Sequence, residues 1–332
     1  MNGTLMAKET REVSDTLVRQ LNRNEKVIAQ LVAKVGESRP SLIYMIGRGS
    51  SDHAGVFAKY LFETTLGIPV CHAALSLSSI YNKALHLENA LVFVISQSGG
   101  SNDIIAQTEM AKQAGAIVVG LINNEDAELR HIVDFFIPLS AGPELAVAAT
   151  KSYIAALSAL IHIAAKLSDN VQLFDDLRTA PKRLKEELEQ PSLITIDAFA
   201  SLERCVVLGR GFGYAIAREM ALKIKEVCAI QAEAFSSAEF SHGPFALLNN
   251  PLSILNVLIY DESKQSHEDR LAIIKSSGGE LMSTLKTAPD LHPAVQCLVI
   301  MQRFYLDIES ISLALGMNPD SPEGLKKVTK TI

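Results

Sequence analysis

A short polar stretch in the first third of the chain has the residue types that an anion site needs. The apolar run ALVFVIS at residues 90–96 ends in QSGGSND, and helix-like sequence follows. Glycines allow a backbone to approach a ligand closely, serine hydroxyls donate hydrogen bonds, and N–H groups at a helix start point toward a bound anion. We therefore expect Ser96, Ser98 and Ser101 to line an anion site, with the two glycines between them forming its turn.

A second turn of similar composition supplies further hydroxyls. The sequence GRGSSD at 47–52 follows another apolar run, and it places Ser50 and Ser51 at the same sheet edge if the two runs are parallel strands. The second half of the chain repeats the GRG turn, but its later turn reads YDESKQSHED and is acidic. A turn that serves folding alone also contains glycine and serine, yet it gives no reason for this difference between the halves. The difference favours an anion site in the first half.

Nucleotide cofactors are not indicated by these glycines. GRGSSD and GRGFGY both begin as G-x-G after an apolar run, but neither completes the G-x-G-x-x-G pattern of a dinucleotide site. The chain has no G-x-x-x-x-G-K-[ST] sequence, and its His, Cys and Asp residues show no metal-ligand spacing. We expect no cofactor and no metal ion.

The elements that would position these turns alternate between strand and helix. Near-continuous apolar runs separated by helices indicate parallel sheets that are covered on both faces. Strands are predicted at 42–47, 90–96, 116–123, 133–139, 205–211 and 253–260. Helices are predicted at 5–35 (one or two), 54–67, 102–115, 148–167, 215–228, 267–279 and 293–316.

The two halves are similar in sequence at two places, which indicates a weak internal duplication. MIGRGSSDHAG resembles LGRGFGYAI, and AKQAGAIVV resembles IKSSGGELM. The predicted fold class is α/β, with two doubly wound parallel-sheet lobes of three layers (α/β/α), flavodoxin-like in topology. The expected organisation is an N-terminal helical segment at 1–35, a first lobe at 36–168, a connector at 169–194, a second lobe at 195–317 and a tail at 318–332.

Composition limits the class of protein. The chain has 332 residues, 48% of them hydrophobic, and a formal net charge of −6, which argues against nucleic acid as a partner. Its longest apolar stretch, YIAALSALIHIAA at 153–165, is too short to span a membrane. The polar N-terminus has no signal-peptide pattern, and the four cysteines lie far apart without CxxC pairing. These features predict a cytoplasmic protein that binds neither nucleic acid nor membranes.

Several longer motifs together resemble the SIS (sugar isomerase) family of phosphosugar-binding proteins. They are GRGSSDHAG, ISQSGGSND, PELAVAATKSY, EMALKIKEVCAIQAEAFSSAEFSHGP and PEGLKKVT. Over nearly its whole length the chain is similar to the isomerase half of glucosamine-6-phosphate synthase. The resemblance implies phosphate contacts at Ser51, Ser96, Gln97, Ser98 and Ser101, and backbone near the sugar at Val147 and Ala148.

The same resemblance implies roles for three residues outside the serine-containing turns. Glu226 would be the carbon acid/base, His242 would work on ring opening, and Lys327 would lie near the anomeric end of the sugar. The resemblance also implies a homodimer with shared active sites, in which His242 serves the neighbouring subunit. The small-molecule partners would be a hexosamine 6-phosphate and fructose 6-phosphate.

The chain departs from the synthase pattern at several points. We expect no glutaminase half, Gly100 stands where the synthase loop has a Glu, and Ala149 replaces a Ser. Without a glutamine-derived supply of ammonia, the expected activity is deamination of glucosamine 6-phosphate to fructose 6-phosphate and ammonia, as in stand-alone SIS-type glucosamine-6-phosphate deaminases. The alternatives are galactosamine 6-phosphate or fructosamine 6-phosphate as the substrate, or a sugar-phosphate sensor without catalysis.

The implied chemistry suits these residue types, although each also has a plainer explanation. A histidine can transfer a proton near neutral pH, a desolvated carboxylate can act as a base, and a lysine can bind a carbonyl oxygen or form a Schiff base. Glutamates on a lysine-rich helix are more often solvated i,i+4 partners, which we expect for Glu219 with Lys223. Glu226 follows Glu219 by seven residues on the same helical face. Similarly, His242 could be a turn residue and Lys327 a solvent-facing charge of the tail.

Overall fold

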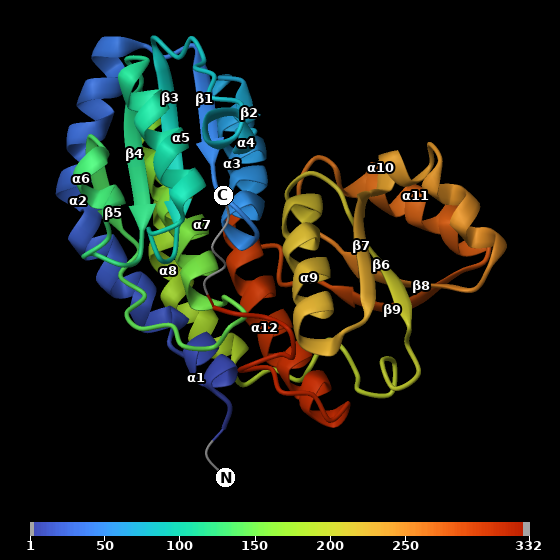
Figure 1. The fold of residues 1–332 in the computed structure, drawn as a ribbon. Helices are drawn as coiled ribbons and strands as arrows, with labels where there is room; N and C mark the ends of the chain where they lie inside the picture. The colour runs from blue at the N-terminus through green and yellow to red at the C-terminus, as the bar shows by residue number, and fades with distance from the viewer. Residues whose placement is uncertain (1–2, 328–332) are drawn as a thin grey trace. The chain divides into compact units, whose positions relative to one another are not determined.

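The computed structural model describes residues 3–327, which Figure 1 colours along the sequence. It contains two compact units, each with its own parallel sheet. Within the described chain, the five-stranded unit comprises residues 13–144, 151–181 and 326–327, and the four-stranded unit comprises residues 3–12, 145–150 and 182–325. Two parallel sheets with helices confirm the predicted fold class. Residues 328–332 of the predicted tail lie outside the described residues.

The sheet of the five-stranded unit has the strand order β2-β1-β3-β4-β5, and all of its strands are parallel. The central strand is β3, and all seven of its residues are buried. This is the order of a flavodoxin-like doubly wound sheet, as predicted. The strands are β1 (Leu42–Ile46), β2 (Val70–His72), β3 (Ala90–Ser96), β4 (Ile117–Ile122) and β5 (Phe135–Pro138).

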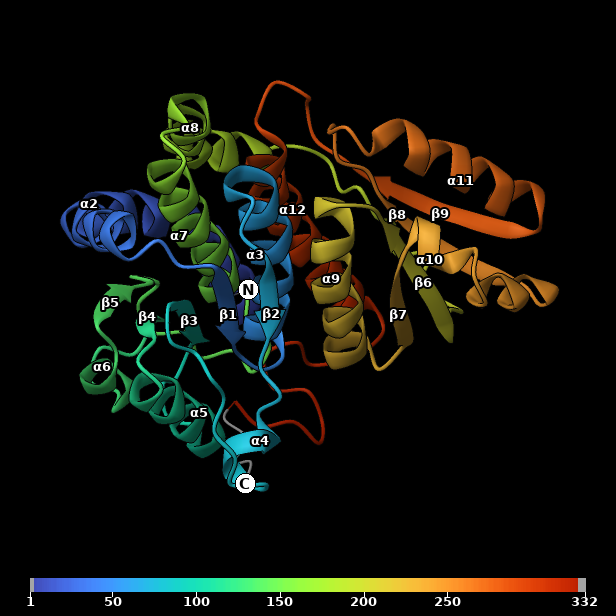
Figure 2. The same ribbon diagram turned by 90° about the horizontal axis from the view of Figure 1, so that it is seen from above.

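Helices cover both faces of this sheet, as the view from above shows (Figure 2). Val92 and Val94 of β3 pack with Ile104 and Met110 of α5 in one apolar cluster. Burial of both faces explains why the strands are apolar without alternation. One face carries α2 (Val13–Ser38), α3 (Ser50–Leu66) and α7 (Lys151–Leu167), and the other carries α4 (Ser76–Ser79), α5 (Asn102–Gln113) and α6 (Leu129–Ile132).

The sheet of the four-stranded unit has the order β7-β6-β8-β9 and is also parallel throughout. In each unit the first strand lies between the second and the third, and the fourth follows the third. The shared topology is the one that an internal duplication would produce. The strands of this unit are β6 (Arg204–Gly209), β7 (Gln231–Ser236), β8 (Leu252–Val257) and β9 (Gly279–Leu285).

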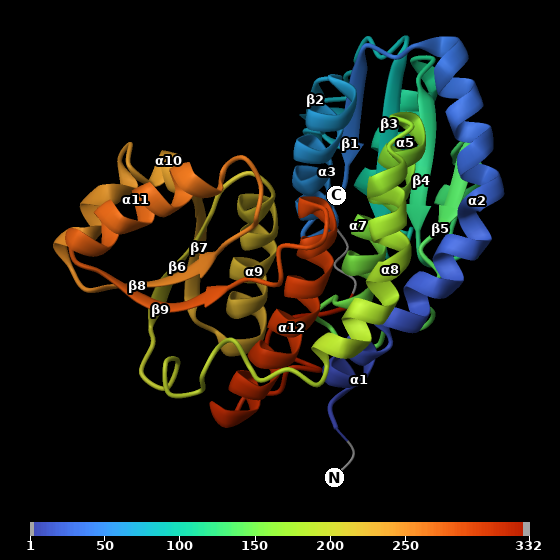
Figure 3. The ribbon, with the colours of Figure 1, turned by 180° about the vertical axis from the view of Figure 1, so that it is seen from behind.

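Helices also cover this second sheet on both faces (Figures 2 and 3). α9 (Phe212–Cys228) covers one face, and α12 (Pro293–Ala314) packs against α9. The other face carries α10 (Ser237–Phe240) and α11 (Lys264–Ser276), with a 3₁₀ helix at Pro244–Asn249 between them in the chain. Within residues 3–327, no helix has both the length and the apolar character that crossing a membrane demands.

The predicted N-terminal helical segment is divided between the units. The short helix α1 (Leu5–Arg11) packs against α12 of the four-stranded unit, where the Thr4 hydroxyl donates to the Glu309 carboxylate at 2.7 Å. The following helix, α2, packs instead against α7 and β5 of the five-stranded unit. A boundary between units therefore falls between α1 and α2.

Three strands and one long helix of the structure are not among the predicted elements, and neither are the short helices α4, α6 and α10 and the 3₁₀ helix. β2, β7 and β9 are edge strands, and in β7 a single residue, Ala232, is buried. Edge strands lack the continuous apolar pattern by which central strands are recognised. The long helix, α8 (Val171–Glu187), occupies most of the segment that we expected to be a connector, and it contains Pro181, which usually ends a helix.

Candidate functional site

The serine turn, residues 96–101, begins where β3 ends. The Ser96 hydroxyl accepts a hydrogen bond from the Gly99 N–H at 2.9 Å, which closes the turn. Gly99 has a φ of +63°, and a Cβ at this position would lie 2.4 Å from the Cβ of Ala127. Conformation and space both exclude a side chain there. At Gly100 a Cβ would meet no atom of the described protein within 4 Å, so the protein's own packing does not require this second glycine.

Hydrogen bonds from Asn124, which lies two residues after β4, hold two carbonyl groups of the serine turn. The N–H of Asn124 donates to the Gln97 carbonyl at 3.1 Å, and its side-chain amide donates to the Ser98 carbonyl at 3.3 Å. Ser101 is the N-cap residue of α5, but within the described chain its hydroxyl makes no capping bond. This hydroxyl is therefore available to a ligand.

The GRG turn, residues 47–49, brings Ser50 and Ser51 to the same edge of the sheet. β1 pairs in parallel with β3, with Ile46 opposite Val94, so the turns that follow the two strands are neighbours. Ser50 and Ser51 are the first two residues of α3 and are half-buried. The structure thus brings the predicted hydroxyl groups of the five-stranded unit together at one edge.

Two charged pairs that the sequence analysis did not single out lie next to these turns. The Arg48 guanidinium forms an ion pair with Asp103, whose wholly buried carboxylate lies in the first turn of α5. The Asp52 carboxylate lies 2.8 Å from Nδ1 of His72. Arg48 could have been found from the sequence, because it is a basic residue within the GRGSSD turn that was expected to lie at an anion site.

Lys327 lies in the five-stranded unit, beside Glu144. Its ammonium donates to the Glu144 carboxylate at 3.1 Å. The same carboxylate is wholly buried and accepts bonds from the N–H and the hydroxyl of Ser152, at 3.0 and 2.7 Å. Lys327 is therefore held by a buried partner, and its side chain is 24% exposed, which differs from a solvent-facing charge of a loose tail.

Glu226 lies near the end of α9 in the four-stranded unit, next to a buried lysine. The Lys223 ammonium contacts the Glu226 carboxylate and lies 3.4 Å from that of Glu219. Burial by itself would lower the pKa of Lys223, but the two carboxylates outweigh it and raise that pKa. The ammonium therefore stays charged, and it orients the Glu226 carboxylate, whose side chain is 23% exposed and open to solvent on one side.

The pairing expected for Glu219 is present, but its solvated character was wrong. Glu219 and Lys223 are both buried, and the Tyr305 hydroxyl donates to the Glu219 carboxylate at 3.2 Å. Tyr305 belongs to α12, which packs over this face of α9. The local sequence of α9 gives no sign that α12 covers it, and so Glu219 and Lys223 were expected to face solvent.

The other predicted residues of the four-stranded unit lie in loops. His242 is exposed in the turn after α10, and its N–H donates to the Glu239 carbonyl at 2.9 Å. The N–H of Val147 donates to the Asp320 carbonyl at 2.9 Å, and the following residue, Ala148, is buried. The candidate residues are thus Ser50, Ser51, Ser96, Gln97, Ser98, Ser101 and Lys327 in the five-stranded unit, and Val147, Ala148, Glu226 and His242 in the four-stranded unit.

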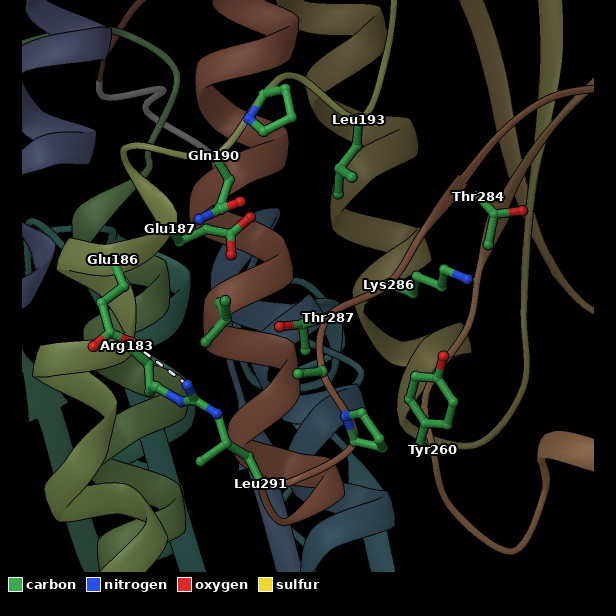
Figure 4. A pocket seen from close by; sticks show the side chains of 14 residues that line it. Arg183, Glu186, Glu187, Gln190, Leu193, Tyr260, Thr284, Lys286, Thr287 and Leu291 are labelled. Atoms are coloured by element: carbon green, nitrogen blue, oxygen red, sulfur yellow. Dashed lines mark hydrogen bonds and ion pairs between the residues drawn. The ribbon is translucent and has the colours of Figure 1, made fainter.

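A cavity of about 510 Å³ also lies in the four-stranded unit, and its described lining contains none of the candidate residues. Figure 4 shows Glu187 from the end of α8 and Lys286 from the segment after β9 among the lining side chains. Arg183 and Glu186 form an ion pair at its edge, with 3.5 Å between nitrogen and oxygen. Its lining therefore carries charges of both signs, unlike the uncharged serine turn.

Comparison with known proteins points to one family. The family described as the SIS domain matches residues 38–165, which include the whole five-stranded sheet and both serine-containing turns. The glutamine–fructose-6-phosphate aminotransferase (isomerizing) of Pseudomonas aeruginosa is 32% identical over 300 residues, which cover 83% of this chain and 48% of that protein. The Escherichia coli K12 protein of the same name is 29% identical over 81% of this chain and 46% of its own length. The chain spans about half the length of these curated relatives.

Solved structures agree along the length of the chain. A protein described as a phosphosugar isomerase from Silicibacter pomeroyi superposes with a TM-score of 0.89 at 30% identity, over 96% of this chain and 100% of that one. The C-terminal domain of glucosamine-fructose-6-phosphate aminotransferase from Francisella tularensis gives 0.79 at 25% identity, over 96% and 98%. Glucosamine-6-phosphate deaminase from Thermotoga maritima gives 0.73 at 21% identity over 96% and 100%, which is a likeness of fold. The SIS domain match over both serine-containing turns, together with 32% identity over 83% of the chain, identifies the chain as a member of the SIS domain family.

Proposed function

We propose that the protein converts glucosamine 6-phosphate to fructose 6-phosphate and ammonia. The observation that carries the proposal is the arrangement at Glu226, where a partly exposed carboxylate is oriented by a buried, charged Lys223. A carboxylate held in this way suits the transfer of a proton between adjacent carbons. The similarity to aminotransferases that are named for fructose 6-phosphate supports an aminosugar phosphate as the substrate.

The phosphate of the sugar is assigned to the serine turn. Ser96, Ser98 and Ser101, the Gln97 amide and the Ser51 hydroxyl supply neutral donors at the carboxyl edge of the five-stranded sheet. The N-terminus of α5 adds its partial positive charge at the same place. Ser50 lies next to Ser51 at the start of α3, and the backbone at Val147 and Ala148 is assigned to the sugar itself.

The reaction then needs three protein groups. His242 transfers a proton between the ring oxygen and the O1 hydroxyl, which opens the ring to the aldehyde. Glu226 removes the proton from C2 and returns it to C1, while the amino group loses one proton and O1 gains one to become a hydroxyl, and this leaves an imine at C2. Water adds to the imine and ammonia leaves, which forms the ketone of fructose 6-phosphate. Lys327, held by Glu144, binds the carbonyl oxygen of the open sugar.

Release of ammonia tests the proposal directly. Purified protein given glucosamine 6-phosphate should form ammonia and fructose 6-phosphate in equal amounts, and the Glu226→Gln variant serves as the inactive control. Galactosamine 6-phosphate and fructosamine 6-phosphate, tested in the same assay, decide between related substrates. Binding of fructose 6-phosphate without ammonia release from any of the three would contradict the proposal and indicate a sugar-phosphate sensor.

A further inference from the structure

The serine turn has no charge of its own, although the ligand proposed for it is a phosphate. Its residues read SQSGGS and are all neutral. A phosphate monoester carries about two negative charges at neutral pH. Neutral donors can hold such a group, but a nearby cation strengthens the bonds considerably. A cationic side chain that the fold holds beside the turn would supply this charge.

Arg48 is fixed at this edge of the sheet by a buried carboxylate. It is the middle residue of the GRG turn, and its Nε and Nη2 both contact Oδ2 of Asp103. Asp103 is the second residue of α5, two positions after Ser101 of the serine turn. Its other oxygen accepts a bond from the Ile104 N–H at 2.9 Å, so the carboxylate cannot turn away. The guanidinium is thereby held at the first turn of α5, where the serine turn ends.

This ion pair leaves part of the guanidinium free. Arginine has five N–H donors in a planar fork, and Asp103 engages the Nε side of it. Within residues 3–327, the Nη1 group of Arg48 has no hydrogen-bond partner, and the side chain is 46% exposed. This second edge of the guanidinium can donate to a further anionic group.

We propose that Arg48 is a phosphate-binding residue whose free Nη1 edge donates to the phosphate of the sugar ligand, while Asp103 positions it. The inference rests on the proposed function, because it takes the phosphate to be bound at the serine turn. Guanidinium and phosphate match in charge and geometry, and such charge-assisted bonds are about twice as strong as neutral ones.

The four-stranded unit contains a matched control. Arg210 occupies the middle of the second GRG turn, and Gly211 after it has the same backbone angles as Gly49, φ 53° and ψ −127°. There, however, Oδ2 of Asp261 would lie 3.2 Å from a Cβ on Gly211, so a carboxylate of the protein occupies that space. Arg210 thus lies in the same GRG sequence as Arg48, but in a turn that a carboxylate of the protein already borders.

The test is calorimetric binding of fructose 6-phosphate to the wild type, Arg48→Met and Arg210→Met. Arg48→Met should raise the dissociation constant about 10- to 100-fold, and the loss should shrink as salt increases. Arg210→Met should bind as the wild type does. Inorganic phosphate, used as a competitor, should lose affinity with Arg48→Met in the same proportion, because the contact is to the phosphate. An Arg48→Met protein that binds as tightly as the wild type would overturn the proposal.

A double variant separates binding from a structural role. Arg48→Met alone leaves the Asp103 carboxylate buried without its partner and could disturb the fold. Arg48→Met/Asp103→Asn removes both charges, so a purely structural pair predicts recovery of wild-type affinity, whereas a phosphate contact predicts that binding stays weak. Arg48→Lys should recover part of the affinity. If the wild type binds fructose 6-phosphate but releases no ammonia, only the proposed reaction fails; if it does not bind, the role of Arg48 is refuted.

Discussion

The first strand of each sheet is followed by a GRG turn, and the two turns differ in what lies beside them. Gly49 and Gly211 have identical backbone angles in GRG sequences that follow the first strand of each sheet. A Cβ on Gly49 would meet no described atom within 4 Å. A Cβ on Gly211 would meet Oδ2 of Asp261 at 3.2 Å and the Ser263 hydroxyl at 3.3 Å. The space that is open in the five-stranded unit is filled by a carboxylate in the four-stranded unit.

The Asp261 side chain is held beside the second GRG turn by hydrogen bonds from Ser263. Its Oδ1 accepts the N–H and the hydroxyl of Ser263, at 2.8 and 2.6 Å, directly before α11. Burial raises the pKa of the Asp261 carboxyl above its usual value. Two turns with the same backbone angles can therefore differ in whether the protein's own side chains fill the space beside them. In the function that we propose, the five-stranded unit binds the phosphate and the four-stranded unit supplies the acid/base Glu226.

The largest effect should be on kcat and should come from Glu226, the proposed acid/base, which does not contact the phosphate. Glu226→Gln should lower kcat by about 10³-fold, because the amide cannot take up the C2 proton. Binding of fructose 6-phosphate should stay within a few-fold of the wild type, since the phosphate contacts that we propose lie in the other unit. Calorimetry and the ammonia assay on the same preparation measure both quantities. Substantial residual turnover would remove Glu226 from the mechanism.

The next largest effect should separate the two glycines of the serine turn. Gly99→Ala places a Cβ against Ala127 at a positive φ, and we expect it to cost about 2–4 kcal/mol of unfolding free energy and to weaken sugar-phosphate binding. Gly100→Ala is the matched control, because its Cβ would meet no described atom. Urea denaturation and calorimetry should show the difference. Equal losses at both positions would mean that the turn is not fixed in this way.

One buried histidine in each unit should make stability depend on pH. Burial lowers the pKa of His162 and of His267 to about 4, and the charge of Arg210 adds to the effect at His267. Between these two pKa values the unfolded chain binds a proton that the folded chain does not. The contribution of each histidine to the free energy of unfolding is therefore fully present above a pH of about 6.5 and decreases as the pH falls toward 4. At a pH of about 5 each histidine should account for about 2 kcal/mol.

A single substitution isolates one of these histidines. His267→Gln removes the titrating group, so we expect the loss of unfolding free energy between about pH 7 and pH 5 to be roughly 2 kcal/mol smaller in the variant. Urea denaturation at both pH values provides the measurement. An unchanged pH dependence would show that His267 is already protonated in the folded protein.

The smallest effect should come from single hydroxyl groups at the two matched turns. Ser98→Ala should weaken binding of fructose 6-phosphate by about 1.5 kcal/mol, since one hydrogen bond to a charged group is lost. Ser263→Ala, in the turn between β8 and α11 of the four-stranded unit, removes the hydroxyl that donates to Asp261 and should leave binding unchanged. Calorimetric titration of both variants makes the comparison. Equal weakening would place an anion in both units.

Much of the fold could be predicted because its signals are local. The central strands β3 and β4 are apolar throughout, and the helices between strands show their start and end within a few residues. The edge strands β2, β7 and β9 were missed because their stability comes from neighbouring strands rather than from their own pattern, and α8 was missed because it contains Pro181, which usually ends a helix. The position of the serine turn was also predictable, because it follows directly from a parallel strand and the helix after it.

By itself, the sequence determined the alternation of strands and helices, the two serine-containing turns and their common edge, because each depends on residues close together in the chain. The tertiary structure decided which charges meet: Arg48 with Asp103, Lys327 with Glu144, and Lys223 between two carboxylates under α12. It also decided that Asp261 fills the second GRG turn. Arg48 and Lys327 pair with residues far away in the sequence. Lys223 pairs with residues of its own helix, but it is buried because α12 covers them.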